Sequence, residues 1–204
     1  TLPNYSVFDE SRYFTPSSTL STKKINDCYC NLMICEDVWD DKNTFLALQS
    51  EVDFSIIINS SPYSINKYQQ RLDKCLKFSK KTQKPIIYLN QVGACDSLIF
   101  DGNSFIIDHN SENIANLSSF SEDYVIIEID KSSNISVINS KNHNFKFNNY
   151  IDDPLSYMYN ACILGVRDYV RKNNFSKVLI GMSGGIDSAL VATIACDALG
   201  HENV

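Results

Sequence analysis

The amino-acid sequence predicts an α/β fold, and three features of its 204 residues support this class. Short apolar runs typical of buried strands alternate with stretches of helical periodicity. The stretch 139–152, in which Asn, Lys, His and Phe alternate without a sustained period, separates two such regions. Near the end of the chain, a glycine-rich turn joins an apolar run to a helical pattern, which is typical of a phosphate-binding loop.

The composition is that of a globular protein with an acidic surface. Hydrophobic residues make up 44% of the chain and charged residues 21%, and no apolar run reaches the roughly 18 residues of a membrane span. The net charge of −6 offers no basic surface for nucleic acid. The seven cysteines are scattered singly apart from Cys28 and Cys30. This odd number and spacing favour reduced thiols and a cytoplasmic location over a disulfide framework.

The region before residue 139 is predicted to be rich in strands. Residues 1–24, with many Ser, Thr, Pro and Tyr, indicate a loop. A hairpin is expected over 98–107 around the turn-forming Asp101-Gly102 pair. A helix is predicted over 65–81, and Pro85 prevents its continuation. Further strands are expected at 32–34, 54–58, 86–89, Val125–Ile129 and 135–138.

The region after the linker begins with a strong helix start. Asp153 is placed to cap a helix that has Pro154 in its first turn. A short strand is expected at 177–181, followed by a helix over 186–199 that Gly200 closes. The predicted organisation is a first domain over 1–138, a linker over 139–152 and a second domain over 153–204. Because the chain starts at Thr1 and stops directly after a helical pattern, we expect a piece of a longer protein.

The sharpest signal is the six-residue string that follows the apolar run 178–182. Glycines there let the backbone turn tightly and approach a ligand without obstruction by a Cβ. The next helix offers N–H groups and the positive end of its dipole to an anion. A carboxylate in such a loop repels a bare phosphate, so it favours a Mg²⁺ ion between the two. The predicted ATP-binding residues are Ser183, Gly184, Gly185, Ile186, Asp187 and Ser188, with Asp187 as the metal ligand.

The alternative is an ordinary strand-to-helix turn in which Ser and Asp act as caps. The lysine of the G-x-x-x-x-G-K-[ST] loop is missing, so that family of nucleotidases is excluded. The string resembles the pyrophosphate-binding loop of ATP pyrophosphatases, which adenylate a substrate and release pyrophosphate. Residues 159–161, 164–170 and 188–192 are similar to the start of an NAD⁺ synthetase domain, so the resemblance covers the chain from Asp153 onward.

Cys35 is the candidate nucleophile, because an apolar strand runs directly into it. A catalytic cysteine must be a thiolate, which needs a nearby cation or a helix N-terminus. Glu36 and Asp37 raise the pKa of such a thiol unless they face away or bind substrate. The local sequence therefore lacks a cation that must come from elsewhere. The alternative is that Cys35 is a small buried hydrophobic residue.

Five strings favour the catalytic interpretation, and they occur in the same order as in a known family. They are 2–14, with Leu-Pro-Asn-Tyr and Phe-Asp-Glu, then Ile-Cys-Glu-Asp-Val-Trp at 34–39, Asn-Ser-Ser-Pro-Tyr at 59–63, Asn-Gln-Val-Gly at 90–93 and Phe-Asp-Gly at 100–102. Together they resemble the nitrilase-type glutaminase domain of glutamine-dependent NAD⁺ synthetases. The chain departs from the family at 93–97, where Gly-Ala-Cys-Asp-Ser replaces a Gly-Gly pair and an acid-rich stretch.

The resemblance implies roles for single residues. Cys35 matches the nucleophile, and Glu36 matches a residue that holds the amino group of glutamine. Ser61 and Tyr5 match positions that line the glutamine pocket, and Glu10 matches a supporting acid. The family's oxyanion-stabilising Lys and general-base Glu lie upstream of the Leu-Pro-Asn-Tyr string, outside this chain. We therefore expect the chain alone to be inactive as a glutaminase.

The resemblance also implies the overall fold, reaction and ligands. The fold is part of a nitrilase-like α-β-β-α sandwich, followed by the first β-α unit of a parallel, doubly wound nucleotide-binding domain. The reaction couples glutamine hydrolysis to the amidation of nicotinic acid adenine dinucleotide, with ATP and Mg²⁺, in an enzyme expected to be a homo-oligomer. Two alternatives stay open: a non-catalytic remnant of such an enzyme, and another amidotransferase of the ATP-pyrophosphatase group.

Overall fold

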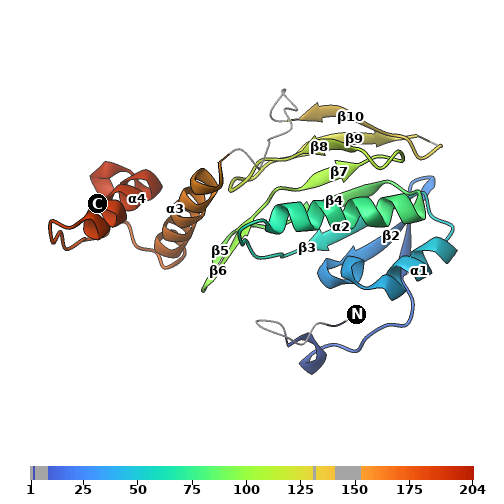
Figure 1. Ribbon diagram of the computed structural model, residues 1–204, viewed down its shortest axis with the longest axis horizontal. Coiled ribbons are helices and arrows are strands. Elements are labelled where there is room, and N and C mark those ends of the chain that lie inside the picture. The colour runs from blue at the N-terminus through green and yellow to red at the C-terminus, as the bar shows by residue number, and fades with distance from the viewer. Residues whose placement is uncertain (1, 3–8, 131, 141–152) are drawn as a thin grey trace.

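The computed structural model describes residues 2, 9–130, 132–140 and 153–204. Tyr5 and positions 141–152 of the expected linker lie outside the described residues. A mixed sheet of six strands, in the order β1-β2-β3-β4-β7-β8, forms the centre of the larger part of the molecule (Figure 1). The strands are β1 (Ser21–Ile25), β2 (Cys28–Ile34), β3 (Phe54–Asn59), β4 (Ile86–Asn90), β7 (Phe105–Ile107) and β8 (Asn113–Asn116).

The middle of this sheet is parallel, and its edges are antiparallel. β2, β3 and β4 run parallel, so that Ile34 lies beside Ile58 and Asn59 beside Asn90. β1, β7 and β8 are antiparallel to their neighbours. Strands were thus correctly predicted at 32–34, 54–58 and 86–89. The loop predicted over 1–24 ends sooner, because Ser21–Ile25 pairs with β2 as an edge strand.

Two helices cover one face of the sheet. They are α1 (Asp41–Gln49) and α2 (Lys67–Thr82), the second close to the helix predicted over 65–81. Figure 1 shows α2 lying along the strands. The core between these layers contains Met33, Val38, Ala47, Ile57, Tyr68, Cys75, Phe78, Ile86, Tyr88, Phe105 and Ile107.

The opposite face of the sheet carries a second hairpin. It consists of β9 (Val125–Ile129) and β10 (Ile135–Ser140), two strands that the sequence predicted. Its apolar side chains pack on Ile87, Ile106 and Ala115, whose neighbours in sequence face the helices. This alternation is the two-residue period of a strand buried on both sides.

The hairpin predicted over 98–107 is wrong. β6 (Leu98–Asp101) pairs with β5 (Val92–Cys95), and the turn between them contains Asp96, which has a φ of 52°. β7 instead pairs with β4 and β8 in the main sheet, where all three of its residues are buried. Burial of Phe105–Ile107 on both faces outweighs the local turn preference of the Asp101-Gly102 pair.

The second region consists of α3 (Pro154–Lys172) and α4 (Ile186–Leu199). As predicted, Asp153 caps α3, since its carboxylate accepts the N–H of Ser156 at 3.0 Å. Gly200, with a φ of 89°, ends α4. The strand predicted at 177–181 is not formed in the described part of the chain, because a strand needs a neighbour to pair with and none lies beside it.

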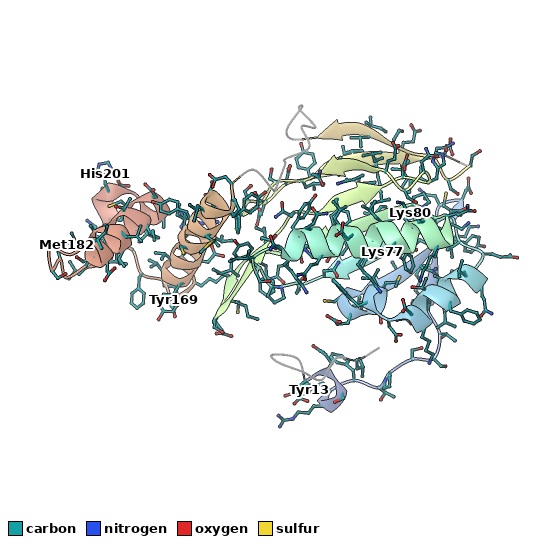
Figure 2. All side chains as sticks on the ribbon, viewed as in Figure 1. Tyr13, Lys77, Lys80, Tyr169, Met182 and His201 are labelled. Atoms are coloured by element: carbon teal, nitrogen blue, oxygen red, sulfur yellow. The ribbon has the colours of Figure 1, made fainter. Side chains whose placement is uncertain are left out.

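The two regions touch through α3. Figure 1 shows α3 beside the β5–β6 hairpin, and α4 beyond it. Figure 2 shows Met182, in the loop before α4, well apart from Lys77 on α2. The contact of α3 contains Phe120, Ala161 and Leu164, with Tyr63, Val92, Ile99 and Tyr157 packed around them.

Among the described residues, no helix has the length and apolar character to cross a membrane.

Candidate functional site

Cys35 lies where the parallel strand β2 ends and a short 3-10 helix, η2 (Cys35–Trp39), begins. Its φ of 43° is in the left-handed region, which is uncommon for a residue with a Cβ. Such strain persists only where the surrounding structure imposes it, and it concentrates at functional sites. Because Ile34 is in register with Ile58, Cys35 lies at the same sheet edge as the Ser60–Ser61 turn after β3.

The two acids after Cys35 have different surroundings. One carboxylate oxygen of Asp37 accepts the N–H of Ile34 at 2.9 Å, and the other lies 3.4 Å from the Asn43 amide. Asp37 therefore fixes the turn that carries Cys35. Glu36 acts on the thiol itself, because its charge raises the pKa of Cys35. From the sequence, either acid could raise the pKa of Cys35. In the structure the charge of Glu36 does so, whereas the Asp37 carboxylate bonds within the turn.

The pKa of the Cys35 thiol is raised, first by burial and second by the charge of Glu36. Three groups oppose this rise: the backbone N–H of Ser60, the ammonium of Lys67 and the backbone N–H of Glu36. The cation that the local sequence lacked is thus Lys67, which also lies 4.8 Å from the centroid of the Trp39 ring. The net balance favours the neutral thiol in this chain.

Sequence reasoning missed Lys67, although a topological signal was available. In a parallel β-α-β unit, the helix begins above the carboxyl end of the preceding strand. Lys67 is the first residue of α2, and α2 joins the parallel strands β3 and β4. A cation at that position therefore lies at the same edge as Cys35.

A cavity of about 480 Å³ opens beside the thiol. The structure brings three of the predicted site residues, Glu10, Cys35 and Glu36, together in its wall. Ser61 is not among the described residues of that wall, and it is 5% exposed. The wall contains Leu2, Glu10, Phe14, Thr15, Pro16, Ser17, Thr19, Leu20, Ser21, Leu32, Ile34, Cys35, Glu36, Asp37 and Asn43.

The second candidate site is the exposed loop before α4. Gly184 has a φ of 82°, and a Cβ built on it meets no atom within 4 Å. The Ser183 hydroxyl lies 3.1 Å from that of Ser188 and accepts the Gly185 N–H at 3.4 Å. Two hydroxyl groups therefore lie close to each other at the start of α4, whose first N–H groups can bind an anion.

Asp187 belongs to the first turn of α4 but does not cap it. Gly185 is the N-cap residue, and no side chain caps this helix end. No group of three or more His, Cys, Asp or Glu side chains in the described ranges is arranged to hold a metal ion. A single carboxylate still suits Mg²⁺, which is commonly bound by one or two carboxylates together with substrate phosphates. The donor set around Asp187 fits a metal that arrives with a nucleotide.

Polar contacts tie α3 to the first region. The carboxylate of Asp168 accepts the backbone N–H of Ala94 at 2.8 Å, and the Lys172 ammonium donates to the Ala94 carbonyl at 2.5 Å. Gly93 has a φ of 131°, and a Cβ there would come within 3.2 Å of the Asp168 carboxylate. Glycine at 93 thus permits the close approach of α3 to this hairpin.

A thiol at the carboxyl edge of a parallel α/β sheet is an arrangement found in cysteine-dependent hydrolases. The family model of carbon-nitrogen hydrolases matches residues 2–138, and the chain belongs to this family. The NAD synthase family model matches residues 158–204.

Two curated relatives and one solved structure that resemble the chain over its whole length share one name. The glutamine-dependent NAD(+) synthetases of Acinetobacter baylyi and Thermotoga maritima are 38% and 36% identical to the chain, over all of its length. The structure of the glutamine-dependent NAD+ synthetase of Acinetobacter baumannii, in complex with ADP, superposes over the whole chain with 37% identity and a TM-score of 0.87. The chain spans 36% to 40% of the length of these relatives.

Proposed function

We propose that this chain contributes the nucleophile and the pyrophosphate-binding loop of a glutamine-dependent NAD⁺ synthetase. The observation that carries the proposal is the presence of two separate sites in one chain: the strained Cys35 beside its cavity, and the open loop 183–188. Matches to two families, at residues 2–138 and 158–204, support a division into domains over 1–138 and 153–204 with a linker over 139–152. Assembly as a homo-oligomer stays a prediction.

At the first site, Cys35 attacks the side-chain amide of glutamine. The carbon–sulfur bond forms, the carbon–nitrogen bond breaks, and ammonia leaves with a proton; water then hydrolyses the thioester to glutamate. Free glutamine carries an ammonium and a carboxylate, so a pocket for it needs charges of both signs. The charges of Glu36 and Lys67 both act on the same thiol, and these two residues would supply them. Tyr5 and Glu10 are proposed to line this pocket, whereas Ser61, which is 5% exposed and lies outside the described wall of the cavity, stays a prediction.

At the second site, the carboxylate of nicotinic acid adenine dinucleotide attacks the α-phosphorus of ATP, and pyrophosphate leaves. Ammonia then displaces AMP from the adenylate to give the amide. Ser183, Ser188 and the N–H groups of Gly184, Gly185 and Ile186 bind the pyrophosphate part. Asp187 would hold Mg²⁺, which neutralises charge on the leaving pyrophosphate. The open space at Gly184 supports this assignment.

Separate sites predict separable losses in the full-length protein. Cys35→Ala should abolish NAD⁺ formation from glutamine and leave formation from added ammonia unchanged, because only the first chemistry uses the thiol. Cys95→Ala, at an exposed cysteine that ends β5, is the matched control and should change neither rate. Equal loss of both activities in a folded Cys35→Ala protein contradicts the assignment.

Asp187→Asn tests the second site. If Asp187 holds Mg²⁺, the rates with glutamine and with ammonia should both fall by roughly 100-fold, since a lost charge contact in the transition state can cost about 3 kcal/mol. The Mg²⁺ requirement at fixed ATP should rise, while the melting temperature stays near normal. Normal adenylation with an unchanged Mg²⁺ dependence would return Asp187 to a purely structural role in the first turn of α4.

One observation favours a second candidate, in which the chain by itself only folds and binds. The raised pKa of the Cys35 thiol disfavours the thiolate that attack on an amide requires. Glutamate release by the 204-residue chain, compared with its Cys35→Ala variant, decides between the two. Cysteine-dependent turnover by the chain alone, at the rate of a full-length enzyme, excludes the binding-only candidate.

A further inference from the structure

The first region contains a fully buried ion pair. The guanidinium of Arg71, on α2, donates two hydrogen bonds to the carboxylate of Asp101, at the end of β6, with distances of 2.9 and 2.5 Å. The two side chains are 0% and 1% exposed. Desolvation of both charges makes such a pair weak support for stability, and apolar residues of similar volume often replace one without loss. A role other than stabilising the fold is therefore needed to explain why this ion pair is present.

The bonds of this pair lead to the turn after β3. Arg71 Nη1 also donates to the Ser61 carbonyl at 3.3 Å. The Asn90 side-chain N–H₂ group donates to Asp101 Oδ1 at 3.3 Å and to the Ser61 carbonyl at 3.4 Å, while Asn90 Oδ1 accepts the Ser61 N–H at 2.9 Å. Asn103 completes the shell of Asp101 with a bond of 2.7 Å. Both backbone groups of Ser61 are thus held by side chains that Asp101 orients.

The residue before Ser61 is the one that reaches the nucleophile. Ser60 follows β3 at the same sheet edge as Cys35, because Ile34 is in register with Ile58, and its backbone N–H lowers the pKa of the Cys35 thiol. The Ser60 hydroxyl donates to the Gln91 side chain at 2.7 Å, which holds this residue from its other side. A shift of the turn by a fraction of an ångström would misalign the Ser60 N–H, since hydrogen bonds weaken steeply with angle.

We propose that the buried Arg71–Asp101 ion pair is a positioning device that holds the Ser60–Ser61 turn against Cys35. The proposal deepens the proposed glutaminase site and rests on it for its consequence in catalysis. Directional bonds from a bidentate guanidinium supply what an apolar core cannot, namely a fixed orientation of the backbone donor. Arg71 and Asp101 touch neither substrate nor sulfur, and they act through Ser61 and Ser60.

The decisive measurement is the reactivity of Cys35 toward iodoacetamide, followed by mass spectrometry of its peptide across pH. Arg71→Lys keeps the charge but loses the planar fork and its reach to Ser61. The double variant Arg71→Met/Asp101→Leu keeps an approximately filled core and removes every directional bond of the pair. Both should be alkylated about tenfold more slowly at pH 7, with the pH profile displaced upward by about one unit.

The matched control is Lys74→Met, one turn further along α2, which removes the partly exposed contact of Lys74 with Asp41. It should leave the alkylation profile unchanged. In the full-length protein, the pair variants should lower kcat for glutamine more than they raise KM, and leave ammonia-dependent synthesis intact. A folded pair variant with a normal Cys35 profile overturns the proposal. A displaced profile without any glutamine turnover in the wild type leaves the positioning role standing and refutes the proposed function instead.

A measurement on the unaltered protein covers the case in which the variants do not fold. A turn held on both sides should open only with the whole sheet, so the Ser61 amide should exchange with solvent as slowly as the amides of β4. Exchange of the Ser61 amide at least 100-fold faster than that of β4 would show a loosely held turn, and it would overturn the proposal.

Discussion

The contact between α3 and the β5–β6 hairpin should depend on Asp168. Its carboxylate is 16% exposed and accepts the backbone N–H of Ala94, a residue that is itself buried. A hydrogen bond to a charged group contributes about 1.5–3 kcal/mol, and its loss leaves the buried N–H without an acceptor. The partly exposed ion pair with Lys172, at 3.7 Å, adds only about 0.3–0.5 kcal/mol. Asp168→Ala should therefore weaken the contact by about 2–3 kcal/mol.

Hydrogen exchange with mass spectrometry measures this loss locally. Opening of α3 away from the hairpin should become roughly 30- to 150-fold more frequent, because each 1.4 kcal/mol is a factor of ten. Amides of α3 that exchange through this opening should speed up by that factor, while those of β3 and β4 stay unchanged. Asp168→Asn, whose side-chain oxygen still accepts, should produce a smaller effect of about 1 kcal/mol.

Asp73→Ala provides the matched control. Asp73 lies on α2 and accepts a hydrogen bond from Gln69 at 2.8 Å on an exposed surface, so its removal should change stability by less than about 0.5 kcal/mol. Unchanged exchange of the α3 amides in a folded Asp168→Ala protein would refute the reasoning. It would mean that the apolar cluster around Leu164 alone holds α3 in place.

Three further outcomes are expected. Leu164→Ala should destabilise the contact of α3 by about 2–5 kcal/mol in urea unfolding, because Leu164 is 2% exposed and a cavity remains; an unchanged midpoint would contradict its place in the core. Asp153→Ala should cost about 1 kcal/mol, through loss of the cap on the Ser156 N–H, and Asp153→Asn should restore most of it. Burial and, second, the charge of Glu36 raise the pKa of Cys35, so its alkylation should accelerate only at a pH above the range of an ordinary thiol. Glu36→Gln should move this pH profile to lower pH. A displacement to higher pH would contradict the effect assigned to Glu36.

The sequence was a sufficient guide where local chemistry decides the outcome. Pro154 at the start of α3, Asp153 as its cap and Gly200 at the end of α4 act within a few residues of the chain, and all three were predicted correctly. The apolar runs 54–58 and 86–89 likewise form β3 and β4, because a strand that is buried on both faces has apolar residues at successive positions.

Sequence reasoning failed where the partner of a segment lies far along the chain. β6 pairs with β5 and β7 with β4, and no local rule separates this pairing from a hairpin around Gly102. The same holds for the site. Lys67 is 32 positions from Cys35, and Arg71 is 30 positions from Asp101, so only the folded sheet brings them together.

A single topological principle explains how the Cys35 site is built. The carboxyl edge of the parallel strands collects residues that follow β2, β3 and β4, and helix starts lie over the same edge. Cys35, the Ser60–Ser61 turn and Lys67 all meet there. The loop 183–188 shares only the helix start, at α4, because no strand of the described structure directly precedes it. Since α3 contacts the hairpin through Asp168 and the core through Leu164, a displacement of α3 should reach Tyr63, two residues from Ser61. The Asp168 and Arg71 variants can therefore be compared by one readout, the alkylation profile of Cys35. If only the Arg71 variants change that profile, the position of α3 does not affect the Ser60–Ser61 turn.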